Sequence, residues 1–213
     1  MLAAERQGNL IGIQNALWVD GSGDHWTYGG SFGDIGNLTL KRNGEQIGRL
    51  IDPYGVFKVP DEDSAYELTQ HLEKIYSGDR NWLRSTAADT TWSFRSHLEP
   101  DVYSRGLPLL HPAYDMPVDG LNTLPAQGGI KVGLSVEGHA GYTPGAIKEA
   151  SLSYSYDDGA TWTKAPTEQR DGKWTAVLDH TGASGKQVTM KATFTDANGN
   201  AVTQTIKRAY DVR

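Results

Sequence analysis

The sequence of 213 residues contains no cysteine. This absence excludes disulfide bonds, thiolate nucleophiles and cysteine-based zinc sites, although it leaves the compartment undecided. No run of about 18 apolar residues occurs, so we expect no transmembrane span. Residues 1–6 lack the apolar stretch of a signal peptide. The chain is therefore expected to be either cytosolic or cut from a longer exported precursor.

A strong excess of charge of either sign is also missing. The formal net charge is −6 at pH 7, and such a mildly acidic surface disfavours nucleic acid and anionic membranes as main partners. Hydrophobic residues make up 38% of the chain, which suffices for sandwich cores because about half of each strand faces solvent. The length fits two domains of about 100 residues or one larger β domain.

Apolar and polar residues alternate through the C-terminal half. The runs with this period of two lie at 130–136, 152–156, 174–178, 188–194 and 202–212. This pattern is typical of antiparallel strands with one buried face. The turn dipeptides between the runs include Asp158-Gly159, Asp171-Gly172 and Asn198-Gly199. Such dipeptides favour hairpins because their residues tolerate positive φ. The half therefore reads as a β-sandwich of immunoglobulin or fibronectin type.

The N-terminal half is less regular. Residues 38–47 read as a hairpin around Asn43-Gly44, and Trp92 and Phe94 lie on one face of a strand. The segment 63–74 fits two interpretations, since its apolar residues match a strand and also one face of a helix. Its acidic start would suit a helix N-terminus. We favour the strand because the surrounding sequence is β.

Between the halves lies a proline-rich segment, residues 106–117. Its three prolines exclude a helix or a central strand. It also contains Leu107, Leu109 and Leu110, which a flexible linker would not need. We expect an ordered connector packed at a domain junction. The predicted fold is therefore all-β, with two tandem antiparallel β-sandwich domains at 1–105 and 118–213.

One motif has a clear local chemistry. Ser155, Asp157, Gly159, Thr161 and Trp162 form the pattern S-x-D-x-G-x-T-W, called an Asp-box. The aspartate accepts hydrogen bonds from the backbone of a tight turn, and the glycine supplies a positive φ. The tryptophan then folds back as an apolar plug. We interpret the motif as a structural hairpin without catalytic function.

Short segments along the whole chain carry a family likeness. They are 8–15, 30–36, 66–69, 94–96, 107–110, 138–142, 203–205 and 208–212. In order and spacing they resemble the C-terminal accessory region of large, secreted, subtilisin-like serine peptidases (subtilases) of actinobacteria. The resemblance implies a non-catalytic part of an exported, extracellular enzyme. It also implies two partners, the catalytic domain of the parent chain and protein substrates.

The catalytic residues of that family do not carry over. No segment of the G-T-S-M, H-G-T, D-T-G or D-S-G type is present. Ser31 lies in a G-x-S-x-G pattern, but no helix start follows it, so we interpret the segment as a glycine-rich turn. The six histidines form no H-x-H or H-E-x-x-H pair; they are His25, His71, His97, His111, His139 and His180.

Two kinds of ligand site remain as hypotheses, and no cofactor other than calcium is expected. Asp20, Ser22 and Asp24 offer calcium alternate oxygen donors, as do Asp196, Asn198 and Asn200, although a hairpin turn explains the second set better. Tryptophans in loop-rich sequence could stack on sugars; these are Trp18, Trp26 and Trp82.

Three functions follow from these observations. The leading one is a non-catalytic accessory region that stabilises a subtilisin-like catalytic domain or guides protein substrates to it. The alternative is a carbohydrate- or cell-wall-binding β-sandwich that uses the loop tryptophans. The third, an independent enzyme with Ser31 as nucleophile and His25 as base, lacks an evident orienting acid.

Overall fold

The computed structural model describes residues 3–14, 16–19, 26–27, 34–75, 82–139 and 141–213. Every regular element in these ranges is a β-strand, so the predicted all-β class is confirmed. The strands form one large sheet, two sheets of four strands and a two-stranded pair. All of these sheets are antiparallel apart from one short parallel pairing.

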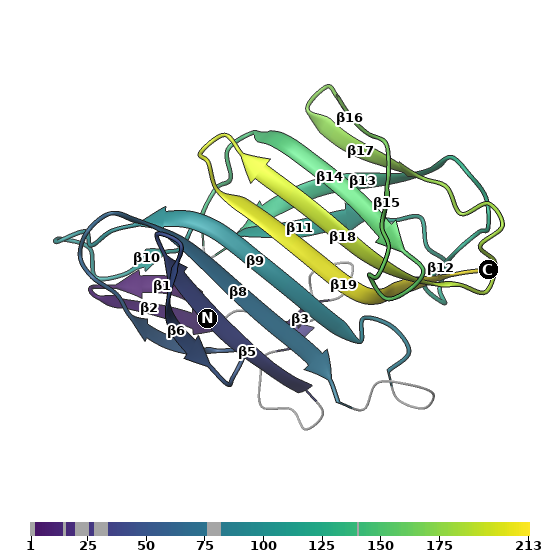
Figure 1. Ribbon diagram of the computed structural model, residues 1–213. Helices are drawn as coiled ribbons and strands as arrows, with labels where there is room; N and C mark the ends of the chain where they lie inside the picture. Colours follow the sequence, from purple (N-terminus) through teal and green to yellow (C-terminus); the bar gives the residue numbers. More distant parts are fainter. Residues whose placement is uncertain (1–2, 15, 20–25, 28–33, 76–81, 140) are drawn as a thin grey trace.

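The large sheet, called the long sheet below, joins strands from both halves of the chain (Figure 1). Its order is β15-β14-β18-β19-β9-β8-β5-β6. The N-terminal half supplies β5 (Asp34–Arg42), β6 (Glu45–Leu50), β8 (Ser64–Lys74) and β9 (Ala87–Ser96). The C-terminal half supplies β14 (Ile147–Ser155), β15 (Thr163–Lys164), β18 (Gln187–Asp196) and β19 (Ala201–Val212). A short strand, β12 (Thr123–Leu124), pairs with β19 in parallel.

Each half also has a small sheet of its own. The first has the order β10-β1-β2-β7 and contains β1 (Ala3–Gln7), β2 (Leu10–Gln14), β7 (Gly55–Lys58) and β10 (Arg105–Gly106). The second has the order β11-β13-β17-β16 and contains β11 (Leu110–Asp115), β13 (Ile130–Gly138), β16 (Thr167–Arg170) and β17 (Lys173–Leu178). The remaining pair is β3 (Trp18–Val19) and β4 (Trp26–Thr27).

The ambiguous segment 63–74 is the strand β8, as favoured from the sequence. Its side chains alternate between buried and more exposed along the whole strand, with Tyr66, Leu68 and Leu72 on the buried side. It pairs with β5 on one side and with β9 on the other. A helix would bury residues three and four apart, so this period of two excludes the helical interpretation.

Two of the three turn dipeptides named from the sequence have a positive φ at both residues. Asp158-Gly159 has φ values of 56° and 94°, and Asp171-Gly172 has values of 49° and 77°. Both residues of each pair are left-handed. Asp171-Gly172 forms a two-residue hairpin turn, because Arg170 pairs with Lys173, whereas Asp158-Gly159 lies within the longer loop between β14 and β15. In the third pair, Asn198-Gly199, the glycine alone has a positive φ, at 83°.

The two halves are joined by strand pairing as well as by the chain. β9 pairs with β19, and Trp92 lies opposite Val202 in this pairing, called the seam below. Buried apolar residues from the long sheet and from both small sheets belong to one cluster. The division into two tandem domains stays a prediction, but a continuous sheet and core cross the expected boundary near residue 105.

The proline-rich connector is ordered and half of it is a strand. Residues 110–115 form β11 at the edge of the second small sheet, where Pro112 lies opposite Val136. An edge strand accommodates proline because one side of it makes no ladder hydrogen bonds. Leu107, Leu109 and Leu110 are buried, so these leucines belong to the core between the sheets.

Candidate functional site

The Asp-box closes the turn between β14 and β15 through its aspartate. Asp157 Oδ1 accepts hydrogen bonds from the Ser155 hydroxyl at 2.6 Å and from the Thr161 backbone N–H at 2.8 Å. Its Oδ2 accepts from the Thr161 hydroxyl at 2.6 Å. Hydrogen bonds from Ser155 and then from Thr161 lower the pKa of the Asp157 carboxyl to about 2. The carboxylate therefore acts as a turn clamp and stays ionised.

The tryptophan of the motif lies over the turn. A Cβ on Gly159 would approach the Trp162 ring to 3.1 Å, and the glycine φ of 94° also disfavours any other residue. The Lys191 ammonium lies 4.2 Å from the centre of this ring, a cation–π distance. The Trp162 ring is thus in contact with Gly159 of the turn and with Lys191 of β18.

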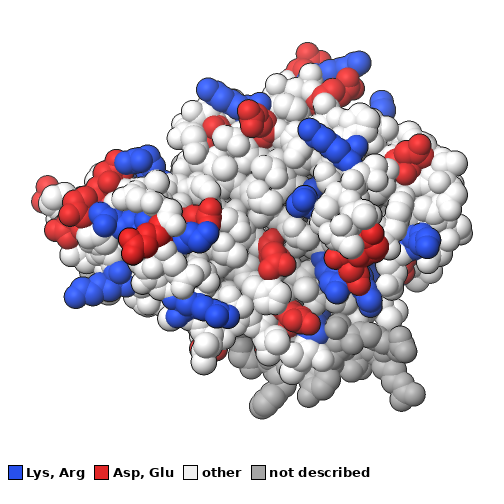
Figure 2. Space-filling model, viewed as in Figure 1, with Lys and Arg blue, Asp and Glu red and all other residues white. Residues whose placement is uncertain are grey.

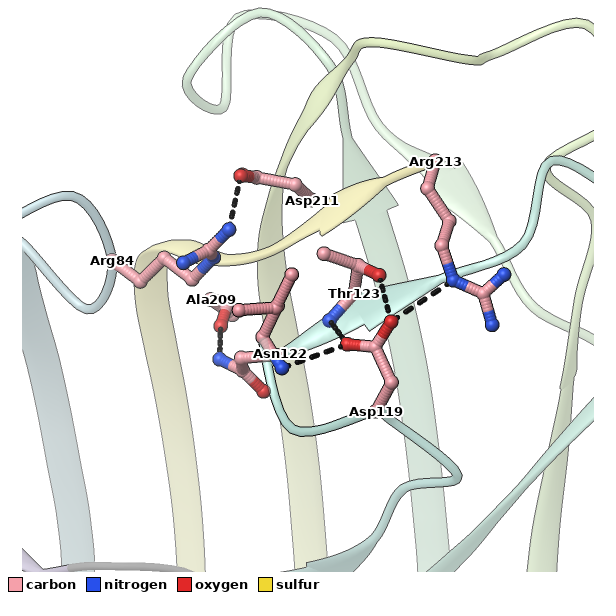
Figure 3. Close-up of polar contacts among 8 residues, drawn as sticks. Arg84, Asp119, Asn122, Thr123, Ala209, Asp211 and Arg213 are labelled. Carbon is pink, nitrogen blue, oxygen red and sulfur yellow. Dashed lines mark hydrogen bonds and ion pairs between the residues drawn. The ribbon is translucent and has the colours of Figure 1, made fainter.

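An open pocket of about 550 Å³ lies beside this hairpin. Residues 156–158, 185–187 and 211–213 line it, together with Thr123. Figure 3 shows the polar contacts at this end of β19: Arg84 Nη2 donates to Asp211 Oδ2 at 2.6 Å. Asp211 Oδ1 is buried and has no hydrogen-bond partner among the described residues. The pocket lining therefore includes a residue, Asp211, with one buried carboxylate oxygen that has no donor among the described residues.

A second ion pair, next to the pocket, holds the loop before β12. Arg213 Nε donates to Asp119 Oδ2 at 3.0 Å, and the same carboxylate accepts from the backbone N–H and hydroxyl of Thr123 (Figure 3). These bonds from Thr123 lower the pKa of Asp119. The Asn122 side-chain amide donates to the Ala209 carbonyl at 2.9 Å. The loop is thereby fastened to the end of β19.

A buried histidine lies between two tyrosines in the core of the C-terminal half. His180 has no exposed surface, and its Nδ1 is 2.7 Å from the Tyr156 hydroxyl, while its Nε2 is 3.0 Å from the Tyr210 hydroxyl. Burial raises the pKa of Tyr156 to about 12 and lowers the pKa of His180. The phenol therefore stays protonated and the imidazole neutral near pH 7. Both imidazole nitrogens are thus in contact with tyrosine hydroxyls within the core.

Two of the three predicted stacking tryptophans meet, with a lysine between them. Lys74 Nζ lies 4.2 Å from the centre of the Trp18 ring and 4.1 Å from that of Trp82. The same ammonium is 3.2 Å from Asp34 Oδ1. The Trp82 side chain remains 48% exposed, so one aromatic surface is open to solvent next to a fixed cation. The lysine is the residue that the sequence reasoning missed, because no local pattern connects it with either tryptophan.

Several predicted site residues lie outside the described ranges. They are Asp20, Ser22, Asp24, His25 and Ser31, and the side chain of Trp26. Within the described ranges no group of three or more His, Asp or Glu residues is placed to hold a metal ion.

The second oxygen-rich loop is the hairpin turn that the sequence favours. Asp196 accepts hydrogen bonds from the backbone N–H groups of Asn198 and Asn200, at 3.0 Å and 2.9 Å. The Tyr142 hydroxyl and the Gly145 N–H occupy its other oxygen. These protein donors saturate the carboxylate, so the structural interpretation of this loop is confirmed.

A histidine pair links the two halves. The Ala4 backbone N–H donates to His139 Nε2 at 2.7 Å, and His139 Nδ1 is 3.1 Å from His111 Nε2. His139 Nε2 is therefore an acceptor, so its Nδ1 carries the proton and donates to His111. Burial, followed by the neighbouring His139, lowers the pKa of His111 to about 4. No local pattern predicts this pair, because its members are 28 residues apart: His111 is in β11, and His139 directly follows β13.

No protein-family model matches the chain, and no curated protein matches it either. In the described ranges there is no helix of the length and hydropathy needed to cross a membrane. Function is therefore inferred from the residues and their geometry.

Proposed function

We propose that the chain is a non-catalytic accessory region of a secreted subtilisin-like serine peptidase, in which it stabilises the catalytic domain or guides protein substrates to it. The observation that carries this proposal is that the polar clusters are bonded internally. Asp157, His180 and the His111–His139 pair each hold strands or turns together. In the described ranges no serine hydroxyl is hydrogen-bonded to a histidine, which is the pairing that a serine nucleophile needs.

We also propose an immunoglobulin-like sandwich for the C-terminal half. Its strands appear in the orders β11-β13-β17-β16 and β15-β14-β18-β19. Lettered along the chain, these are A-B-E-D and C′-C-F-G, the arrangement of immunoglobulin-like domains. Sandwiches of this kind commonly serve as binding or spacing modules, and the seam joins this one to the N-terminal half without a flexible linker.

The test joins the chain to the subtilisin-like catalytic domain that the proposal places before it. The joined protein is expected to melt at a higher temperature than the catalytic domain alone, or to cleave large proteins faster at an equal rate on short peptides. The isolated chain should give no adduct with a fluorophosphonate probe. If neither melting temperature nor substrate preference changes, both forms of the proposal are wrong.

A carbohydrate- or cell-wall-binding role is the second candidate, favoured by the half-exposed Trp82 ring. Aromatic rings that are open on one face stack on sugar rings. The test measures adsorption to insoluble polysaccharides for the wild type, Trp82→Ala and Trp18→Ala. Loss in Trp82→Ala alone is the expected result, because the Trp18 ring packs against Lys74 and the small core cluster beside it. Adsorption that survives both changes would contradict stacking.

A further inference from the structure

The outer face of the long sheet carries an in-register row of hydroxyl groups. Its members lie directly opposite one another on six neighbouring strands: Thr39 on β5, Thr69 on β8, Thr91 on β9, Thr203 on β19, Thr193 on β18 and Ser151 on β14. We call this set the hydroxyl row. Every member is partly exposed. The row crosses the seam, so it combines strands from both halves (Figure 1).

Strand geometry fixes the spacing of the row. Neighbouring strands lie about 4.8 Å apart, so five steps across the sheet span about 24 Å. The hydroxyls of Thr69 and Thr91 are 3.0 Å apart, and those of Thr193 and Thr203 are 3.2 Å apart. A hydroxyl has one donor and two acceptor positions. Each bonded pair therefore keeps one O–H donor and several lone pairs for a ligand.

Charged side chains of both signs lie beside the row. Lys41 pairs with Glu67 at 2.7 Å, and the His71 ring lies 2.7 Å from Asp89. The row itself has no ionisable side chain. Figure 2 shows this side of the molecule, where uncharged surface separates scattered charges of both signs. A surface with little net field does not select a polyanion or a polycation.

The same composition argues against a protein partner on the row. The centres of protein interfaces are enriched in aromatic residues, methionine and arginine. The row offers only small polar side chains in the positions where such a centre would lie. A partner that matches it must be neutral and must present repeated donors and acceptors along its length.

We propose that the hydroxyl row binds one chain of an uncharged polysaccharide, which lies across the strands and exchanges hydrogen bonds with successive hydroxyls. This site is separate from the tryptophan cluster, which involves the inner side of β8 through Lys74. It is also independent of the proposed role beside a peptidase, and each can fail without the other.

The test uses adsorption to microcrystalline cellulose and chitin, and retardation in gels that contain a soluble β-glucan. The triple variant Thr69→Val/Thr91→Val/Thr203→Val removes three hydroxyls and keeps the branched shape that strands favour. Its affinity is expected to fall by about tenfold or more, with an unchanged melting temperature. The matched control is Thr195→Val/Thr205→Val, two threonines in neighbouring rows of the same face, which should bind like the wild type.

A second variant separates hydroxyl chemistry from surface hydrophobicity. Serine at positions 69, 91 and 203 keeps the hydroxyls, so Thr69→Ser/Thr91→Ser/Thr203→Ser should retain adsorption. The proposal is overturned if the wild type binds none of the three polysaccharides, or if the valine variant and its control lose binding equally. Loss of adsorption in Trp82→Ala with full retention in the valine variant would place the site at the tryptophan instead. A valine variant that only weakens contact with a peptidase domain would make the row a protein interface.

Discussion

Acidification is predicted to weaken the contact between the two halves through the histidine pair. Because Ala4 N–H donates to His139 and His139 donates to His111, both acceptor nitrogens must be unprotonated for the chain of bonds to exist. Burial lowers the pKa of both histidines. The folded state therefore resists a proton that the unfolded state takes up.

The size of the effect follows from the pKa of His111. The pKa of histidine is 6.5 in the unfolded chain, whereas the pKa of His111 in the folded protein is about 4. Within this window the unfolded state holds more protons, so the free energy of unfolding falls by about 1.4 kcal/mol per pH unit. Between pH 6.5 and pH 5 the expected loss is about 2 kcal/mol, or roughly 4–8 °C in melting temperature. The lowered pKa of His139 acts in the same direction.

The assay is urea unfolding at several values from pH 7 down to pH 5, above the range in which carboxylates with lowered pKa lose their contribution. His111→Gln is the informative variant, because its side-chain oxygen accepts from His139 but does not titrate. It should be less stable than the wild type at pH 7 and should lose less on acidification. His97→Gln, at an exposed histidine, is the control and should behave as the wild type. Equal losses in wild type and His111→Gln would refute the proposed bond chain.

Four further predictions concern the hairpin, the seam and the lysine between the tryptophans. Asp157→Ala should lower the melting temperature because it removes three hydrogen bonds of the turn, and Asp171→Ala in another hairpin is the comparison. Trp92→Phe should cost about 1–3 kcal/mol in urea unfolding, because the Leu110 carbonyl then loses its buried donor at 2.8 Å; a cost near zero would contradict this. Calorimetry of the wild type should show one transition rather than two, since the seam and the shared core couple the halves. Lys74→Met should destabilise more than Trp82→Ala, because it leaves the poorly exposed Asp34 carboxylate without its cation; the reverse order in urea unfolding would contradict the ion-pair assignment.

Local patterns predicted much of the fold. The alternation at 130–136 and 188–194 gave the buried faces of β13 and β18, because period two is a direct consequence of strand geometry. Turns such as Asp171-Gly172 could also be predicted, because the ability to adopt a positive φ depends on the type of one or two residues. The strand at 63–74 was predicted only from the β-like sequence around it, because its own pattern also fitted a helix.

Contacts between segments that are distant in the sequence could not be predicted from local patterns. Nothing in residues 87–96 specifies that β9 pairs with β19 rather than lying at an edge. For the same reason the hydroxyl row, the His111–His139 pair and the lysine between Trp18 and Trp82 were not predicted. Each depends on register between strands that come from separate parts of the chain. The loop tryptophans were candidates for sugar stacking from the sequence, but Lys74, the common neighbour of Trp18 and Trp82, was not predicted.

The position of β19 has a consequence during synthesis. β9 leaves the ribosome roughly a hundred residues before β19, the strand that covers its free side. Until then the nascent N-terminal half presents an open ladder of backbone groups, a template for unwanted pairing with other chains. Addition of β19 covers that edge, so chains truncated before β19 are expected to aggregate and to be degraded.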